Sequence, residues 1–239
     1  MPLSRIDKIL VSQNIGTRKE VQKLIKKGEV TVNNIVEKDY SKKIDPEISN
    51  IKISGETLVF HHYMYIMMNK PGGVISASRD SKKKTVLDLV PKELYRRNLF
   101  PAGRLDIDTE GLLIITNDGN FSHKMLSPVK KVYKIYEALV SGIVTSKEIA
   151  DFKKGITLEN GEVYLPAELK IIKNDDKNSV VEVKICQGKF HQVKRMFLAV
   201  GLKVLHLKRK QIGGLKLDDK LGLGDCREMT PAEIDLIFK

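Results

Sequence analysis

Residues 103–111, with the sequence GRLDIDTEG, bring several chemically active side chains into one short polar segment. The segment contains Arg104 and leads directly into the apolar run 112–116. It also holds three acids: Asp106, Asp108 and Glu110. Polar groups at the entrance to a core must be paired or functional, because burying them without partners costs free energy. The acids alone allow two interpretations: a charged turn before a strand, or a Mg²⁺ site formed by Asp106, Asp108 and Asp118, as in a metal-dependent nuclease.

A second chemically active stretch extends from Lys184 to Lys210 and contains eight Lys or Arg residues but no Asp or Glu. A run of one sign repels itself unless a partner is expected, so this stretch favours contact with RNA or DNA. Within it, the pattern over residues 190–200 predicts a helix. Its predicted apolar face comprises Phe190, Val193, Met196, Phe197 and Val200. His191 and Lys194 flank that face, and Gln192 and Arg195 point elsewhere.

A third stretch, residues 69–85, is rich in glycine and in basic residues that include Lys70 and Arg79. It lacks the GxxxxGK[ST] spacing of a nucleotide-binding loop, so a nucleoside triphosphate site is not expected. The pattern is typical of a mobile loop that grips a phosphate backbone or of a disordered surface loop.

The overall charge supports a polyanionic partner. The chain of 239 residues has 42 Lys and Arg against 30 Asp and Glu, a formal net charge of +12. Each phosphate that such residues neutralise releases a counterion and adds affinity that does not depend on sequence. Cys186 and Cys226 belong to no zinc-binding or disulfide pattern, so we expect reduced core thiols. No apolar run is long enough for a signal sequence or a membrane span, and we expect a cytoplasmic protein.

Residues 1–59 predict a compact unit of two helices followed by short strands at 29–34, 50–53 and 57–60. Thr17 and Glu20 form the pattern of a capping box, which starts the second helix. That helix carries five basic residues around its apolar stripe: Arg18, Lys19, Lys23, Lys26 and Lys27.

Residues 60–239 predict an α+β domain around a mostly antiparallel mixed sheet with flanking helices. Strands are expected at 63–68, 112–116, 132–140, 163–172, 179–186 and 203–209. Helices are expected at 85–90, 121–126 and 190–200, and a last one is opened by Thr230–Glu233.

Four motifs in order carry a family resemblance: YIMMNKPGG, GRLDIDTEGLLIITNDG, KVYKIYEA and GKFHQVKRMFLAVG. Together they resemble the ribosomal small-subunit pseudouridine synthase A family across essentially the whole chain, and residues 1–59 resemble its S4 RNA-binding domain. The resemblance implies an S4-like domain at 1–59 and a catalytic domain at 60–239. It also implies a monomeric enzyme without cofactor or metal, which isomerises a specific uridine of 16S rRNA, free or in a small-subunit assembly intermediate, during ribosome biogenesis.

The same resemblance implies roles for individual residues. Asp106 matches the catalytic aspartate, Tyr133 the tyrosine that stacks on uracil, and Lys194 the basic residue that pairs with the aspartate. Many relatives have Arg in place of Lys194, and Lys keeps the charge but loses the bidentate fork. Arg104 matches the residue that holds the target nucleotide out of the helix. Further RNA contacts are expected from Lys70, His191, Gln192, Arg195 and the basic residues of the second helix, while Asp108, Glu110 and Asp118 are assigned structural roles.

The chemistry agrees with these roles. Pseudouridine formation breaks a C–N bond, rotates the uracil and joins its C5 to the same sugar carbon, with no redox change. It needs an ionised carboxylate beside the sugar and an aromatic platform for a base outside the stack. Three alternatives remain open: a large-subunit 23S rRNA synthase of the same family, a non-catalytic rRNA-binding protein, and the metal-dependent nuclease.

Overall fold

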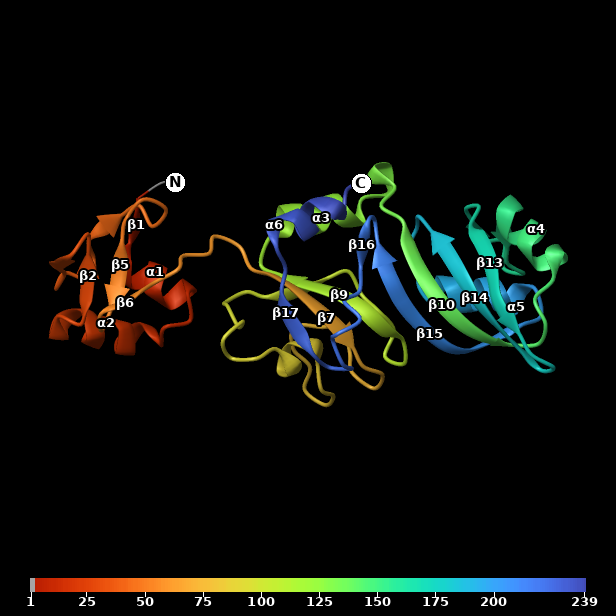
Figure 1. The fold of residues 1–239 in the computed structure, drawn as a ribbon, viewed down its shortest axis with the longest axis horizontal. Helices are drawn as coiled ribbons and strands as arrows, with labels where there is room; N and C mark the ends of the chain where they lie inside the picture. Colours follow the sequence, from red (N-terminus) through yellow and green to blue (C-terminus); the bar gives the residue numbers. More distant parts are fainter. Residues whose placement is uncertain (1–2) are drawn as a thin grey trace. The chain divides into compact units, whose positions relative to one another are not determined.

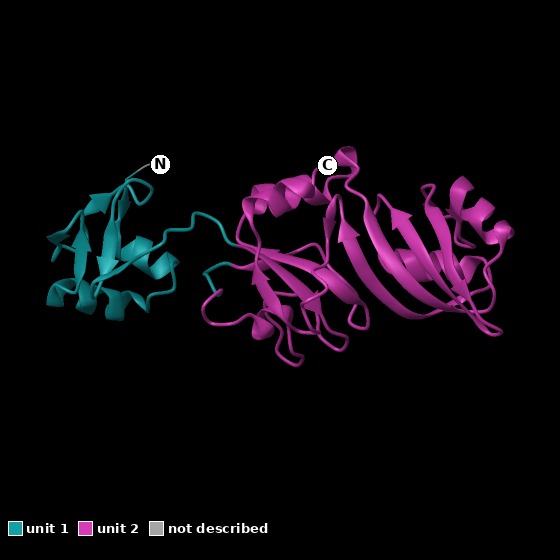
Figure 2. Ribbon diagram, in the orientation of Figure 1, with its two compact units in different colours: residues 1–64, 95–98 teal, residues 65–94, 99–239 magenta. Residues whose placement is uncertain are grey.

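The computed structural model describes residues 3–239 and divides them into two compact units (Figure 2). The first unit ends at Met64 and also includes Tyr95–Asn98, and the second comprises Tyr65–Leu94 and Leu99–Lys239. The α+β class predicted from the sequence is confirmed. No helix within residues 3–239 is both long enough and apolar enough to cross a membrane.

The first unit packs two helices against short antiparallel strands (Figure 1). The helices are α1 (Ile6–Ser12) and α2 (Arg18–Lys27). One sheet has the order β3-β2-β5-β6, and β1 pairs separately with β4. The strands are β1 (Ser4–Arg5), β2 (Val30–Val32), β3 (Ile35–Val36), β4 (Lys43–Ile44), β5 (Ile51–Ile53) and β6 (Glu56–Thr57). The predicted capping box of Thr17 and Glu20 is confirmed, because each side chain accepts a hydrogen bond from the other residue's backbone N–H.

The second unit is built on a nine-stranded sheet (Figure 1). Seven of its strands have the order β13-β14-β10-β15-β9-β7-β17, and the other two, β8 and β16, pair with β9 and β15. Its strands are β7 (Tyr65–Lys70), β8 (Phe100–Ala102), β9 (Glu110–Thr116), β10 (Lys134–Ser141), β13 (Glu168–Asn174), β14 (Asn178–Ile185), β15 (Lys203–Ile212), β16 (Leu215–Lys216) and β17 (Cys226–Glu228). The pairing is antiparallel except between β9 and β15. This confirms the mostly antiparallel mixed sheet.

Helices cover the two halves of this sheet. On the half formed by β7 and β9, α3 (Gly119–Leu126) and α6 (Pro231–Leu236) enclose a core that includes Phe121 and Ile237 (Figure 1). On the other half, α4 (Ser146–Lys154) and α5 (Gln192–Ala199) meet through the rings of Phe152 and Phe197, whose centroids lie 4.9 Å apart. Two further strands, β11 (Ile156–Thr157) and β12 (Val163–Tyr164), form a separate hairpin.

Three sequence predictions about elements need correction. The helix expected at 85–90 is one 3-10 turn, η1 (Val86–Leu89), and a second such turn, η2 (Pro128–Lys130), was not predicted. Helix α4 was also missed, although Thr145 and Glu148 form a capping box that announces it. Helix α5 starts at Gln192 and not at Phe190 as predicted. The backbone of His191 is left-handed, with φ of +49°, so neither His191 nor Phe190 belongs to the helix.

The parallel contact between β9 and β15 depends on Gly111. Its φ of +100° is accessible to glycine, and a Cβ at this position would lie 2.3 Å from the carbonyl oxygen of Arg209. The two strands can therefore approach closely at the point where the polar segment 103–110 enters the sheet.

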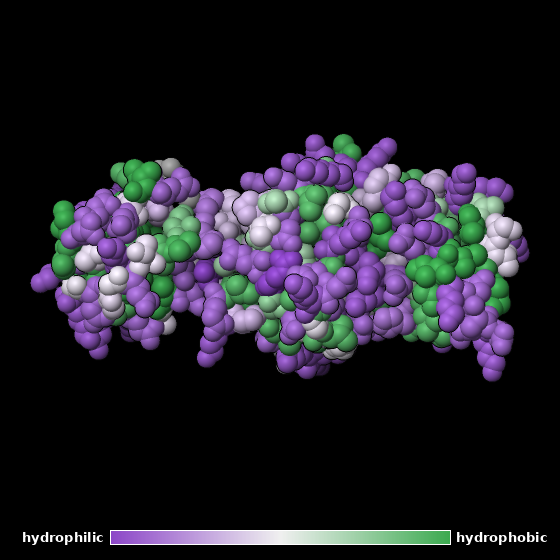
Figure 3. All heavy atoms as spheres, in the orientation of Figure 1, coloured by the Kyte–Doolittle hydropathy of each residue, from purple (hydrophilic) through white to green (hydrophobic). Residues whose placement is uncertain are grey.

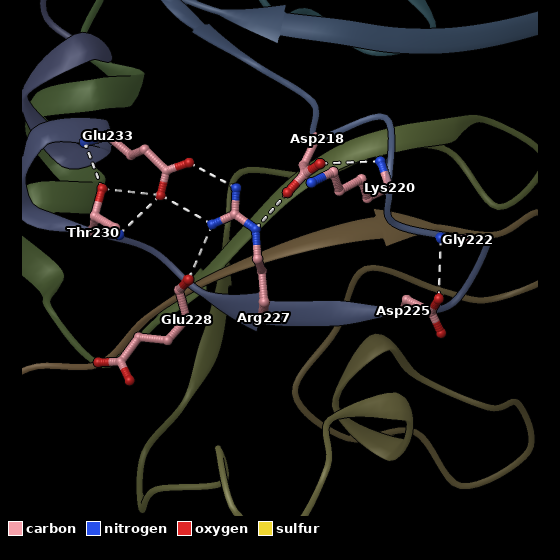
Figure 4. Close-up of polar contacts among 8 residues, drawn as sticks. All are labelled: Asp218, Lys220, Gly222, Asp225, Arg227, Glu228, Thr230 and Glu233. Carbon is pink, nitrogen blue, oxygen red and sulfur yellow. Dashed lines mark hydrogen bonds and ion pairs between the residues drawn. The ribbon is translucent and has the colours of Figure 1, made fainter.

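The C-terminal strand is tied to the last helix by Arg227 (Figure 4). The guanidinium donates to both carboxylate oxygens of Glu233 at 2.7 and 3.0 Å and to Asp218 at 2.8 Å. Hydrogen bonds from Arg227 lower the pKa of Glu233 to about 2. Glu233 also completes the predicted capping box with Thr230, so β17 and α6 are held together at the edge of β7.

Candidate active site

A cleft of about 970 Å³ opens in the second unit. Its walls are formed by residues 75–77, the polar segment 103–107, Lys134 at the start of β10 and residues 186–191 before α5. A recess of about 60 Å³ adjoins it and shares Asp106 with it. Asp106 and the cations around it are thus placed at the junction of the cleft and the recess. Hydrophilic side chains cover much of the face seen in Figure 3, as the composition suggests.

Asp106 lies in a turn, which the N–H of Thr109 closes by donating to its carbonyl oxygen at 3.1 Å. Its carboxylate is partly exposed and faces two cations or potential cations from the α5 region. Lys194 Nζ lies 3.5 Å from Oδ2, and His191 Nε2 lies 3.5 Å from Oδ1. The predicted proximity of Lys194 to Asp106 is therefore present in the structure.

Asp108 is the nearer partner of Lys194, with 2.5 Å between Nζ and Oδ1. This hydrogen bond lowers the pKa of the Asp108 carboxyl. From the sequence, Asp108 was expected to have a structural role within the turn. The structure extends that role, because Asp108 holds the ammonium of Lys194 beside Asp106 from a more exposed position.

Lys70 fixes the opposite side of the same turn and does not contact solvent. Its Nζ donates to the carbonyl oxygens of Pro71, Ile107 and Thr109 at 2.9, 3.3 and 2.9 Å. Burial lowers the pKa of Lys70 to about 8, against the attraction of the acids in the turn. The prediction that Lys70 binds RNA is wrong, since its side chain is fully buried and its donors are used within the protein.

The loop that follows Lys70 also supports the turn. Gly73 N–H donates to the carbonyl of Ile107 at 2.7 Å. The hydroxyl of Ser76 accepts from the N–H of Leu105 and donates to its carbonyl. Residues 70–76 are thus bonded to the polar segment 103–111, which corrects the expectation of a mobile phosphate-gripping loop for this part of 69–85.

Tyr133 is not among the residues that line the cleft or the recess. Residues three apart on an extended chain point to opposite faces, and in β10 Lys134 and Tyr136 are buried while Ile135 is less so. Tyr133 is 41% exposed, and its ring centroid lies 4.7 Å from Lys184 Nζ. Tyr133 therefore lies outside the lining of the cleft and the recess, and its stacking on the flipped uracil stays a prediction.

Tyr136 lines the recess together with Asp106. Its hydroxyl accepts a hydrogen bond of 3.5 Å from the buried guanidinium of Arg209. The alternation of β10 could have identified this residue from the sequence.

Of the other residues predicted to contact RNA, some are exposed and some are bonded to other residues of the protein. Arg104 is exposed at the cleft wall, and His191 stacks on Phe190 with 3.8 Å between ring centroids. Gln192 is buried, its amide bonds to Lys189 N and Met196 Sδ, and it lines the recess, so its predicted RNA contact stays a prediction. Arg195 is half-buried and pairs with Glu162 at 2.8 Å. Phe190, predicted in the apolar face of the helix, is instead 70% exposed.

In the first unit, the basic residues of α2 lie on its outward face. Lys19, Lys23, Lys26 and Lys27 line one shallow depression and are exposed, whereas Arg18 lies 3.6 Å from the buried Asp7. This face has the charge expected of a nucleic-acid contact.

The nuclease interpretation requires Asp118 as a metal ligand, but the carboxylate of Asp118 is used in hydrogen bonds within the protein. Its side chain caps α3 by accepting from Phe121 N–H at 3.0 Å, and it also accepts from the hydroxyl of Tyr65 at 2.7 Å. These bonds confirm its structural role. No group of three His, Cys, Asp or Glu side chains within residues 3–239 is arranged to hold a metal ion. Both cysteines are free thiols, and Cys186 lines the cleft instead of lying in the core.

Comparison with known proteins identifies the family of the chain. The model of RNA pseudouridylate synthases matches residues 64–199, and the model of the S4 domain matches residues 4–47. The chain belongs to the RNA pseudouridylate synthase family. The resemblance drawn from the four motifs is thereby confirmed, and the chain is an RNA pseudouridine synthase with an S4 domain.

Several relatives align with this pseudouridine synthase over nearly its full length. An RNA pseudouridine synthase of Bacillus subtilis is 42% identical over 98% of both chains. The ribosomal small subunit pseudouridine synthase A of Vibrio cholerae is 40% identical over 98% of this chain and 100% of its own. The ribosomal large subunit pseudouridine synthase B of Bacillus subtilis is 36% identical, over 97% and 94%. A crystal structure of a pseudouridylate synthase superposes with a TM-score of 0.67 at 35% identity, covering 98% of this chain and 99% of the other.

Proposed function

We propose that the protein converts a uridine of 16S rRNA, free or in a small-subunit assembly intermediate, to pseudouridine, with Asp106 as the catalytic carboxylate. The observation that carries the catalytic assignment is the placement of Asp106 at the junction of cleft and recess, beside Lys194 and His191. The 16S assignment is supported by the 40% identity to a small-subunit synthase, against 36% to a large-subunit one.

We propose a separate role for each residue of the site. The carboxylate of Asp106 acts on the sugar, and its charge is compensated by Lys194, which Asp108 holds in place. Arg104, exposed at the wall, keeps the flipped nucleotide in the cleft. Tyr133 remains the aromatic platform that the family motif implies, and Tyr136, which lines the recess beside Asp106, is the second candidate for this role. The exposed lysines of α2 bind the RNA backbone.

The test uses 16S and 23S rRNA transcripts, each labelled with tritium at uridine C5, because isomerisation releases that hydrogen to water. The wild-type protein is expected to release tritium from 16S rRNA or from small-subunit particles, and Asp106→Asn is expected to release none. Lys170→Met, a change at an exposed lysine of β13, is the matched control and keeps wild-type activity.

Each outcome bears on one part of the proposal. Release from 23S rRNA alone would show the large-subunit alternative to be correct. Activity that persists in Asp106→Asn would remove that residue from catalysis. No release from either rRNA or from particles would contradict an rRNA substrate.

The two tyrosines are separated by a second comparison. For the tyrosine that stacks on the base, the change to Leu is expected to lower activity about 10- to 100-fold, in line with the loss of one base–aromatic stack, while the change to Phe retains most of the activity. The Leu variant of the other tyrosine is expected to stay near the wild-type rate. Thermal unfolding of each variant checks the fold, and wild-type rates for both Tyr133→Leu and Tyr136→Leu would show that neither tyrosine is the platform.

A further inference from the structure

Lys134 is a buried cation that faces the cleft without a partner. It is the first residue of β10, its side chain is only 7% exposed, and it lines the same cleft as Asp106. Among residues 3–239, no acceptor forms a hydrogen bond or an ion pair with its ammonium. Burying a charge in this way is costly unless something supplies the missing partner.

The charges around Lys134 make its position more unusual. Burial, and then the positive charge of Arg209 on β15, lower the pKa of Lys134 to about 8, while Cys186 after β14 acts weakly in the opposite direction. Across the cleft lie Arg104 and Asp106 on the polar turn. No neighbouring element therefore contributes a bound carboxylate to Lys134, and a ligand with a negative or partly negative atom fits the cleft at this point.

The reaction itself produces such an atom. When the bond between C1′ and N1 breaks, its electron pair stays on the uracil, and the charge spreads over N1, O2 and O4. After the ring has turned, C5 forms a bond to C1′ with a pair of electrons from the ring. The C5 proton is then lost to solvent, and N1 gains a proton. The atoms and electrons balance without any other reactant.

We propose that the ammonium of Lys134 binds a carbonyl oxygen of the flipped uracil and stabilises the negative charge that develops as the glycosidic bond breaks. Lys134 shares the buried side of β10 with Tyr136, two residues further along. Its depth matches a base inserted into the cleft, since the exposed cations Arg104 and those of α2 are better placed for phosphates. A donor fixed where charge develops contributes strongly to rate. The proposal rests on pseudouridine synthesis and not on the choice of rRNA.

The experiment compares Lys134→Met with the wild type and with Lys170→Met, using whichever rRNA the wild type modifies. Single-turnover rates and KM are measured as loss of the target nucleoside from RNA with uridine or with 5-fluorouridine at the target position, because the fluorine on C5 cannot leave as a proton and tritium release does not report on this base. Fluorine withdraws electrons and stabilises the uracil anion, so a variant that lacks the ammonium should be less impaired on the fluorinated base. We expect the rate of Lys134→Met to fall about 100-fold on uridine and clearly less on 5-fluorouridine, with little change in KM.

The pH profile gives an independent readout. The ratio kcat/KM reports groups of the free enzyme, so the wild type should lose activity as pH rises through about 8 and Lys134 gives up its proton. This decline should be absent from Lys134→Met and present in Lys170→Met. Unfolding measurements control for the fold, because replacing an unpaired buried charge by Met should not destabilise the protein.

Three results would overturn the proposal. Equal defects of Lys134→Met on both bases would mean that leaving-group charge is not involved. An increase in KM with an unchanged rate would indicate a phosphate contact instead. A destabilised variant that keeps the decline in activity above pH 8 would make Lys134 structural. A wild type that is inactive on every RNA would contradict the proposed function and this inference with it, whereas an active wild type with any of the three results above would contradict this inference alone.

Discussion

Lys70 and Lys134 occupy two regions of the same unit that resemble each other in charge and burial but differ in partners. Each is buried, and burial lowers the pKa of each to about 8. Lys70, at the end of β7, donates to three carbonyl oxygens, two in the turn that bears Asp106 and one in the loop after β7. Lys134, at the start of β10, has no such acceptor among residues 3–239 and borders the cleft.

This contrast separates a buried charge with a structural role, Lys70, from one for which we propose a function, Lys134. Backbone carbonyls and the acids of the turn compensate the ammonium of Lys70, so its burial contributes to the shape that carries Asp106. The ammonium of Lys134 is instead affected by a second cation, Arg209, and it borders the cleft. Burial alone does not distinguish these cases, whereas the presence of acceptors does.

The largest expected effect is on folding. Lys70→Met should lower the free energy of unfolding by about 3 kcal/mol, because it leaves buried carbonyls without donors. Activity should fall with it, since the turn that bears Asp106 loses its support. Urea denaturation measures the change, with Lys134→Met as the matched variant of equal chemistry. Equal losses of stability in both variants would remove the distinction between the two lysines.

A second effect is the response of stability to alkaline pH. The folded-state pKa of about 8 lies below the unfolded value near 10.5 for both lysines, so unfolding takes up protons between these limits. The cost of the buried charge is fully present below about pH 8, and the free energy of unfolding rises as pH increases toward 10.5.

The measurable quantity is the difference between proteins, because other lysines and tyrosines titrate in the same range. Wild type should gain about 2 kcal/mol more than Lys134→Met between about pH 7.5 and 10.5. Denaturation curves at several pH values are sufficient to compare them. Parallel curves for the two proteins would show that Lys134 is fully charged in the folded state across the range.

The smallest effect concerns the acids that face Lys70. Asp108 is the charge that raises the pKa of Lys70 most, and it is not among the charges that affect Lys134. Asp108→Asn should therefore lower the pKa of Lys70 below about 8 and leave that of Lys134 unchanged. Side-chain NMR of the lysines measures both, with the exposed Asp176→Asn as control. The cost in stability should stay below about 1 kcal/mol, because Asp108 is well exposed. Equal shifts at both lysines would mean that the two regions are electrostatically coupled.

Much of the local structure was predictable from short sequence patterns. The capping boxes of α2 and α6 formed as expected, because both partners lie within three residues of each other. The apolar run after the polar segment became the buried strand β9. The start of α5 was predicted two residues too early, because the apolar pattern continues to Phe190 although the backbone at His191 is left-handed. The motif also did not show that its two tyrosines, Tyr133 and Tyr136, point to opposite faces of the chain.

Residue order alone was sufficient for the residue types of the site, the position of Asp106 before a core strand, and the family. It was sufficient because motifs, caps and alternation are properties of neighbouring residues. The folded arrangement was needed to learn which charges are compensated. Asp108 meets Lys194 across 86 positions of chain, and Lys70 reaches Thr109 across 39, so neither pairing is visible in any local pattern. The lack of a partner for Lys134 is equally invisible in the sequence. Whether a buried charge has an acceptor depends on every element packed around it, here the whole sheet and its cleft.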